Sequence, residues 1–188
     1  MSKFKVTFTL DDDDAEYFRA LYRKAKKNAK LADPEKILRE AQGTVAKVRK
    51  SKKTPKFVLD AIEVLADLTD LVVDTEYAAP QRVKDEVLAG VAYFSNPDDL
   101  IPDHIPGLGY LDDAIMVKFI EEEFRHELWG YRKFKKVRDA SEQRPWAGPG
   151  KDRLSKRLEN DRKKIRAQVA AREAKAVEKK TSGGSSGW

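Results

Sequence analysis

Residues 92–114 read AYFSNPDDLIPDHIPGLGYLDDA, and this stretch decides how the chain folds. Its prolines, Pro97, Pro102 and Pro106, forbid a continuous helix because proline lacks an amide donor and clashes with the preceding turn. Gly107 and Gly109 permit tight backbone conformations. The apolar residues that let this connector pack on a core are Leu100, Ile101, Ile105, Leu108 and Leu111. The pattern predicts a helix, a rigid packed turn and a second helix.

The connector is also rich in acidic residues. Five aspartates lie in it, namely Asp98, Asp99, Asp103, Asp112 and Asp113. The favoured interpretation is that they cap short turns and the start of the next helix, because a carboxylate accepts hydrogen bonds from free amides. The alternative is a site for a hard divalent cation, since such ions prefer oxygen ligands. Its ligands would be Asp99, Asp103, Asp112 and Asp113, with His104 as an auxiliary ligand.

That alternative has a catalytic version, a hydrolase centred on Asp99, Asp103 and Asp112. No nucleophile or well-placed base accompanies the cluster, so the reaction would need a water molecule activated by the metal. The sequence itself predicts no catalytic residue, and no cofactor beyond this divalent cation.

One group of residues in the connector carries a family resemblance: Tyr93, Pro97, Asp99–Asp103, Ile105–Pro106 and Gly109–Asp113. Over about residues 85–125 they resemble the signature of the YkvA-like domain, a small bacterial domain of unknown function. The resemblance implies a helical hairpin closed by an aspartate-proline turn, and it implies membrane association without an established activity. Asp98 and His104 depart from the pattern, because relatives place an apolar and an aromatic residue there.

The helix expected after the connector, Ala114 to about Val137, is too charged to lie in a bilayer. Moreover, the longest stretch free of Asp, Glu, Lys and Arg is Val87–Pro97, which has 11 residues. About 20 apolar residues are needed to span a membrane. The sequence therefore favours a cytoplasmic protein, with peripheral membrane attachment as the alternative.

Upstream of the hairpin, three further helices are expected. Asp11–Asp14 begin one that runs to about Ala29, Asp33-Pro34 begins a second that covers roughly 34–50, and Thr54-Pro55 opens a third over about 55–74. Before them, Lys3–Leu10 alternates polar and apolar residues, which predicts a strand. One strand lacks a partner, so we expect it to pair with a second copy in a homodimer or to lie along the helices.

The third helix carries a stripe of acidic residues three or four positions apart: Asp60, Glu63, Asp67, Asp70 and Asp74. Like charges one turn apart cost about 0.2–0.5 kcal/mol per pair, so the stripe is expected to face positive charge. The first candidate is the basic surface of residues 24–53, and a partner protein is the second. A solvated face is the remaining alternative.

The chain ends in a basic segment. Residues 144–150 (RPWAGPG) predict a hinge, and residues 151–180 hold 12 basic and 5 acidic residues with sparse apolar positions. This pattern predicts a helix that is a poor core element and that projects into solvent or docks on a partner. Residues 181–188 predict a flexible tail.

The composition of the chain excludes several kinds of site. The 188 residues include no cysteine and two histidines, which excludes disulfides, cysteine nucleophiles and a three-histidine zinc site. Charge is segregated, with a net of +7 in residues 1–60, −12 in 61–130 and +11 in 131–188. This asymmetry has two explanations: internal neutralisation, or a basic arm within 131–180 for an anionic partner such as lipid or nucleic acid.

Taken together, the sequence predicts an all-α protein. A compact helical bundle with a short N-terminal strand would occupy residues 1–143 and contain the hairpin at 85–137. The hinge and a protruding basic helix would follow. The leading functional hypothesis is a non-enzymatic scaffold or adaptor, because strong charge segregation accompanies the lack of a catalytic constellation.

Overall fold

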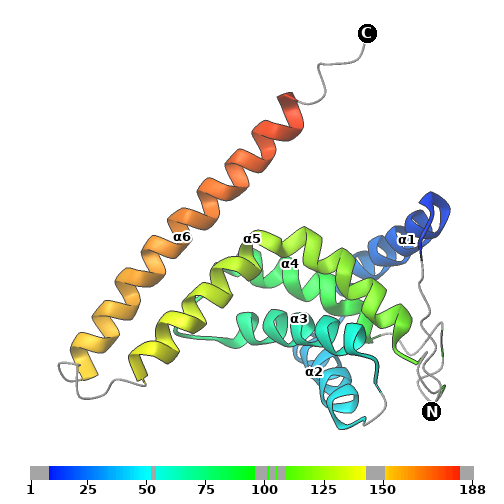
Figure 1. The fold of residues 1–188 in the computed structure, drawn as a ribbon, viewed down its shortest axis with the longest axis horizontal. Coiled ribbons are helices and arrows are strands. Elements are labelled where there is room, and N and C mark those ends of the chain that lie inside the picture. Colours follow the sequence, from blue (N-terminus) through cyan, green and yellow to red (C-terminus); the bar gives the residue numbers. More distant parts are fainter. Residues whose placement is uncertain are drawn as a thin grey trace. The chain divides into compact units, whose positions relative to one another are not determined.

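The computed structural model describes residues 9–51, 54–95, 101, 105, 109–142 and 151–182 (Figure 1). All regular elements in these ranges are helical, so the predicted all-α helical bundle is confirmed for the described part of the chain. They are α1 (Asp12–Ala29), α2 (Pro34–Lys50), α3 (Lys56–Val73), α4 (Gln81–Val91), the 3-10 helix η1 (Ala92–Ser95), α5 (Leu111–Glu142) and α6 (Lys151–Ser182).

Several predicted features fall outside the described residues. The strand predicted at Lys3–Leu10 does so except for Thr9 and Leu10, which are not in a strand. The homodimer predicted through that strand stays a prediction for the same reason. The hinge at 144–150 and most of the tail at 181–188 also lie outside the described ranges.

The first two helices begin where their aspartates predict. The Asp11 side chain accepts a hydrogen bond from the Asp14 amide at 2.9 Å, and the Asp14 side chain accepts one from the Asp11 amide at 3.3 Å. This reciprocal pair satisfies amides that have no partner within the helix. At α2, Asp33 caps the amide of Glu35 at 3.1 Å, and Pro34 occupies the first turn. The capping interpretation of these aspartates is confirmed.

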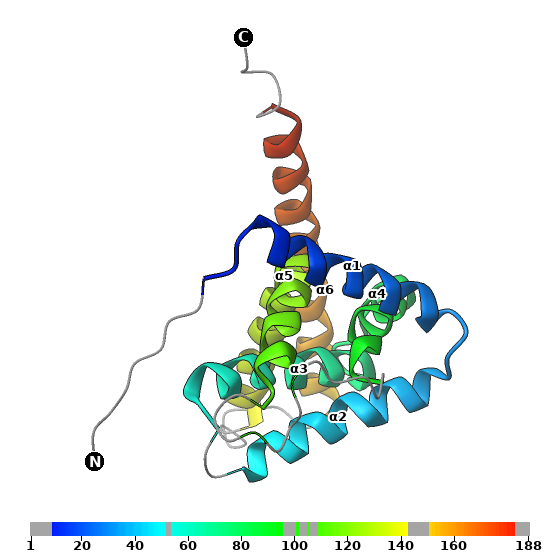
Figure 2. The ribbon, with the colours of Figure 1, turned by 90° about the vertical axis from the view of Figure 1, so that its right-hand side faces the viewer.

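The chain divides into two compact units. Unit 1 comprises Met1–Ile62 and Leu88–Ile120. In it, α1 and α2 are joined by a short turn (Figure 2). Both helices contact η1. Its buried apolar residues include Tyr22, Ile37, Ala41, Val45, Val48, Val58, Ile62, Tyr93, Phe94, Met116, Val117 and Ile120. The ring of Phe18 on α1 also stacks on that of Phe119 on α5, with 6.2 Å between their centroids.

Unit 2 comprises Glu63–Val87 and Glu121–Trp188. Its buried apolar residues include Leu65, Leu68, Leu71, Tyr77, Val83, Val87, Phe124, Leu128, Tyr131 and Phe134, together with Leu158, Ile165 and Val169 of α6. The prediction that α6 is a poor core element is therefore wrong for this part of the helix. Leu158, Ile165 and Val169 are spaced to share one face of α6, and Ile165 and Val169 lie against Gly130 of α5.

Gly130 explains how α5 and α6 approach so closely. A Cβ atom at this position would lie 2.5 Å from Cγ2 of Val169 and 2.9 Å from the hydroxyl of Tyr77. Real Cβ atoms do not tolerate such distances, so glycine is needed in the middle of α5 despite its low helix propensity. The helix is also interrupted at Phe124, whose backbone angles (φ −98°, ψ 15°) are not helical.

None of the helices in the described ranges combines the length and apolar character that crossing a membrane requires.

Candidate functional site

The aspartate-rich connector ends at the start of α5, in unit 1. Asp112 and Asp113 lie there, and their side chains are buried. Oδ2 of Asp112 accepts a hydrogen bond from the Ile101 amide at 3.2 Å, which ties the connector to the first turn of α5. Such a bond to a charged acceptor contributes roughly 1.5–3 kcal/mol. For Asp112, the structure supports the interpretation of the acid cluster as turn chemistry.

The cation site predicted from the same cluster is not brought together in the described part of the chain. Asp99, Asp103 and His104 lie outside the described residues, as does Asp98. Among the residues that are described, no group of three or more acidic or histidine side chains has an arrangement that could hold a metal ion. The cation site therefore stays a prediction, with Asp112 and Asp113 as the members whose positions are known.

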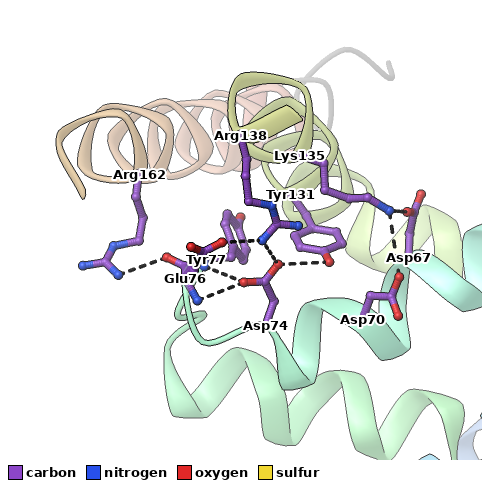
Figure 3. A network of polar contacts seen from close by, with 9 residues as sticks. All are labelled: Asp67, Asp70, Asp74, Glu76, Tyr77, Tyr131, Lys135, Arg138 and Arg162. Carbon is purple, nitrogen blue, oxygen red and sulfur yellow. Dashed lines mark hydrogen bonds and ion pairs between the residues drawn. The ribbon is translucent and has the colours of Figure 1, made fainter. Parts of the chain in front are cut away.

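Three carboxylates of the acidic stripe, Asp67, Asp70 and Asp74, have partners on α5 within unit 2. Nε of Arg132 lies 2.6 Å from Asp67, and Nζ of Lys135 lies 3.0 Å from the same carboxylate. Lys135 also lies 3.9 Å from Asp70. The prediction that residues 24–53 neutralise the stripe is wrong for Asp67 and Asp70, because α5 presents its cations along the same line (Figure 3).

Asp74 is the most connected carboxylate of this network. Its Oδ1 accepts hydrogen bonds from the amides of Glu76 at 3.0 Å and Tyr77 at 2.8 Å. Its Oδ2 accepts from Arg138 at 2.7 Å and from the Tyr131 hydroxyl at 3.3 Å. Burial favours the protonated form, but the hydrogen bonds from Tyr77 and Arg138 outweigh it and hold the pKa of Asp74 below its ordinary value.

The residues after α3 connect this network to α6. Arg138 also lies 3.0 Å from the carboxylate of Glu76, and Nη1 of Arg162 on α6 donates to the Glu76 carbonyl at 3.1 Å (Figure 3). The backbone two residues after Glu76 is strained, because Ala78 has a φ of 45°. A non-glycine residue in this left-handed region costs roughly 1 kcal/mol. The contacts around Glu76 hold the segment in place despite that cost.

A second, more deeply buried cluster lies between α5 and α6. Nη1 of Arg166 is 2.7 Å from Oε2 of Glu127, and the Tyr77 hydroxyl donates to the same oxygen at 3.4 Å. The guanidinium carbon of Arg166 lies 4.2 Å from the centroid of the Tyr77 ring. Burial raises the pKa of Tyr77, which keeps its hydroxyl as a donor. Nε and Nη2 of Arg166 have no hydrogen-bond partner among the described residues, so stacking on the ring is their main contact.

Several basic residues of α6 remain exposed to solvent. The exposed residues of α6 include six basic ones, namely Lys156, Arg157, Lys163, Lys164, Lys175 and Lys179. We call these six residues the outer face of α6. Lys163 is paired with Glu159 on the same helix at 2.7 Å. Lys156, Arg157, Lys164 and Lys175 form no ion pair with another described side chain, so their charge is available to a partner.

Unit 1 also contains a hollow that the sequence did not predict. Its volume is about 260 Å³. The lining is mainly apolar, with Leu21, Ile37 and several alanines, and its polar members include Lys24, Asn28 and Ser95. Among its described lining residues, the hydroxyl of Ser95 has no hydrogen-bond partner.

Sequence reasoning missed the cluster of Tyr77, Glu127 and Arg166, because its members are far apart in the chain. One signal was present, namely Gly130 inside an otherwise helical pattern between Trp129 and Tyr131. An isolated glycine of this kind often marks a close approach of another element.

Comparison with known proteins adds one match. Residues 85–119 match a family described as "Protein of unknown function (DUF1232)". The match covers the end of α4, η1, the connector and the start of α5. No curated protein matches the chain significantly. A search of solved structures likewise finds no significant match.

Proposed function

We propose that this protein is a non-enzymatic helical scaffold that binds an anionic macromolecule through the outer face of α6. The observation that carries the proposal is how the positive charge of residues 131–180 is distributed. Arg132, Lys135 and Arg138 are engaged by the acidic stripe and Glu76. Arg162 and Arg166 are engaged on the inner face of α6. On the outer face, four basic residues, Lys156, Arg157, Lys164 and Lys175, are left without an ion pair among the described side chains.

The internal network also supports a scaffold, because it holds α6 at several points. Leu158, Ile165 and Val169 are buried, and the ion pair between Arg166 and Glu127 adds a polar contact. Arg172 stacks on Trp129 with 4.5 Å from its guanidinium carbon to the ring centroid. A rigidly held row of cations loses less conformational entropy on binding than a flexible tail does.

The hairpin at residues 85–137 is assigned a structural part in this proposal. We regard it as a YkvA-like hairpin, on the aspartate-proline pattern and the family match at residues 85–119. The hydrogen bond from the Ile101 amide to Asp112 suits a structural element.

The test is retention on immobilised heparin, a defined polyanion, with elution by salt. The variant Lys156→Gln/Arg157→Gln/Lys164→Gln/Lys175→Gln removes four outer-face charges. The matched control, Lys27→Gln/Lys36→Gln/Arg39→Gln/Lys47→Gln, removes four charges from exposed positions on α1 and α2. We expect the first variant to elute at clearly lower salt and the control to elute close to the wild type. Equal shifts in both variants would mean that only net charge matters, and the proposal would fail.

A further inference from the structure

The outer face of α6 has a length that suits one class of polyanion. From Lys156 to Lys179 the helix rises about 35 Å, at about 1.5 Å per residue. One turn of duplex DNA measures about 34–36 Å. Basic residues occur near both ends of this span and in its first half, so the helix can reach phosphates over a full turn of a duplex.

The same face is poorly suited to a membrane. An interfacial helix inserts a free apolar face below the lipid headgroups. In α6 the residues that could form such a face, Leu158, Ile165 and Val169, are already buried in unit 2. Between Lys164 and Lys175 the exposed residues include alanines, namely Ala167, Ala170, Ala171 and Ala174. Val177, which is 61% exposed, is the one large apolar side chain of α6 that is prominently exposed in the described part of the chain.

The composition of the face also favours double strands over single strands. Single-strand binding draws much of its affinity from bases stacked on aromatic side chains. Residues 151–180 contain no Phe, Tyr or Trp. Phosphate contacts by lysine and arginine need no exposed bases, and they operate on a duplex without reading its sequence. The small side chains at the centre of the face let the helix backbone come close to the nucleic acid.

We infer that the outer face of α6 binds the phosphate backbone of double-stranded nucleic acid without sequence preference. The inference rests on the proposed function and names the partner of the same surface. Its affinity comes from release of counterions, so log affinity falls linearly with log salt by about 0.9 per phosphate contacted. The four outer-face cations that form no ion pair with a described side chain therefore predict a slope of about −3.6.

The test is fluorescence anisotropy with a labelled DNA duplex of about 21 base pairs, two turns, at several salt concentrations. Between about 50 and 200 mM salt we expect wild-type affinity to fall on the order of 10²-fold. The variant with four outer-face substitutions should bind weakly, and its slope should be smaller by about 3.6. The α1/α2 control should retain the wild-type slope. A duplex of scrambled sequence should bind equally well, and a single strand of the same length should bind more weakly.

Parallel titrations separate this inference from the proposed function. The other probes are poly-glutamate and vesicles of phosphatidylserine and phosphatidylcholine. If either binds through the outer face while the duplex does not, the surface is an anion-binding face but the assignment to nucleic acid is wrong. If no probe, heparin included, depends on the outer face, the proposed function itself is wrong. Circular dichroism of each variant confirms that the helices remain folded.

Discussion

Nη1 of Arg138 lies 2.7 Å from Oδ2 of Asp74, although the two residues are 64 positions apart in the sequence. The pair joins the end of α3 to the last third of α5, and both side chains are largely shielded from solvent. It belongs to a network in which Asp74 also binds two backbone amides. Because several bonds converge on one carboxylate, its loss should have a measurable effect on the free energy of unfolding.

For Asp74→Asn we expect a destabilisation of about 1.5–3 kcal/mol at neutral pH, since hydrogen bonds to a charged group are replaced by weaker ones. The folded protein holds the pKa of Asp74 below its value in the unfolded chain. The unfolded chain therefore takes up the proton first as the pH falls. The stabilisation is fully present above the unfolded pKa of about 3.9 and is lost as the pH falls through the folded pKa. The free energies of unfolding of the wild type and Asp74→Asn should therefore approach each other as the pH falls. Urea unfolding of both proteins from pH 7 to pH 2 measures this difference.

The matched control is Asp85→Asn on α4, where the carboxylate is exposed and accepts one hydrogen bond from Gln81 at 2.8 Å. Its cost should stay within about 0.5 kcal/mol. A difference between the wild type and Asp74→Asn that persisted unchanged to pH 2 would show that the Asp74 charge does not stabilise unit 2.

Gly130→Ala tests the close packing of α5 and α6. The added methyl group would meet Val169 and Tyr77, so we expect a loss of about 1–3 kcal/mol despite the better helix propensity of alanine. The double variant Gly130→Ala/Val169→Ala makes room for the methyl group and should recover part of the loss. The control is Gly43→Ala in α2, where no atom lies within 4 Å of the new Cβ. It should stabilise the protein by about 0.5–1 kcal/mol. If thermal unfolding showed that Gly130→Ala is as stable as Gly43→Ala, the close approach of α6 to Gly130 would be contradicted.

The buried pair of Glu127 and Arg166 should behave non-additively. Glu127→Ala leaves the guanidinium without its anion and should cost about 3–5 kcal/mol. Replacing both partners, as in Glu127→Leu/Arg166→Met, removes the unpaired charge and should recover most of that stability. A double-mutant cycle by urea unfolding measures the coupling. Additive losses would mean that the two charges do not interact, against the 2.7 Å separation in the structure.

Asp112→Asn distinguishes turn chemistry from cation binding in the connector. If Asp112 stabilises the fold through the Ile101 amide, the variant should be destabilised equally in EDTA and in excess Mg²⁺, Mn²⁺ or Ca²⁺. A bound cation would instead raise the unfolding temperature of the wild type with ion concentration, by mass action. Differential scanning fluorimetry of both proteins gives the answer, and a cation-dependent shift seen only in the wild type would favour the predicted metal site.

Local signals explain what the sequence could predict. Asp11 and Asp33 cap amides two or three residues away, so their short-range chemistry locates the helix starts without knowledge of the fold. Residues near each other in the chain determine these features.

Features that depend on distant residues were less predictable. The acidic stripe indicates that positive charge lies nearby. Coulomb attraction depends only on charge and distance, so it does not indicate whether residues 132–138 or residues 24–53 supply that charge. Similarly, three apolar residues in α6 look insufficient for a core until Gly130 brings the helix close enough to bury them. The wrong predictions for the acidic stripe and for α6 both concern which helices pack together. The periodicity of residues along one helix does not indicate which other helix it contacts.

The burial of α6 beside α5 has a consequence for synthesis on the ribosome. Tyr77 and Gly130 emerge early, but the side chains that cover them, Ile165, Arg166 and Val169, are translated some 35 to 90 residues later. Until those residues leave the exit tunnel, the nascent chain exposes an unfilled apolar groove and the uncompensated carboxylate of Glu127. Completion of unit 2 is therefore a late event, and chaperones that recognise exposed apolar segments have a defined interval in which to act.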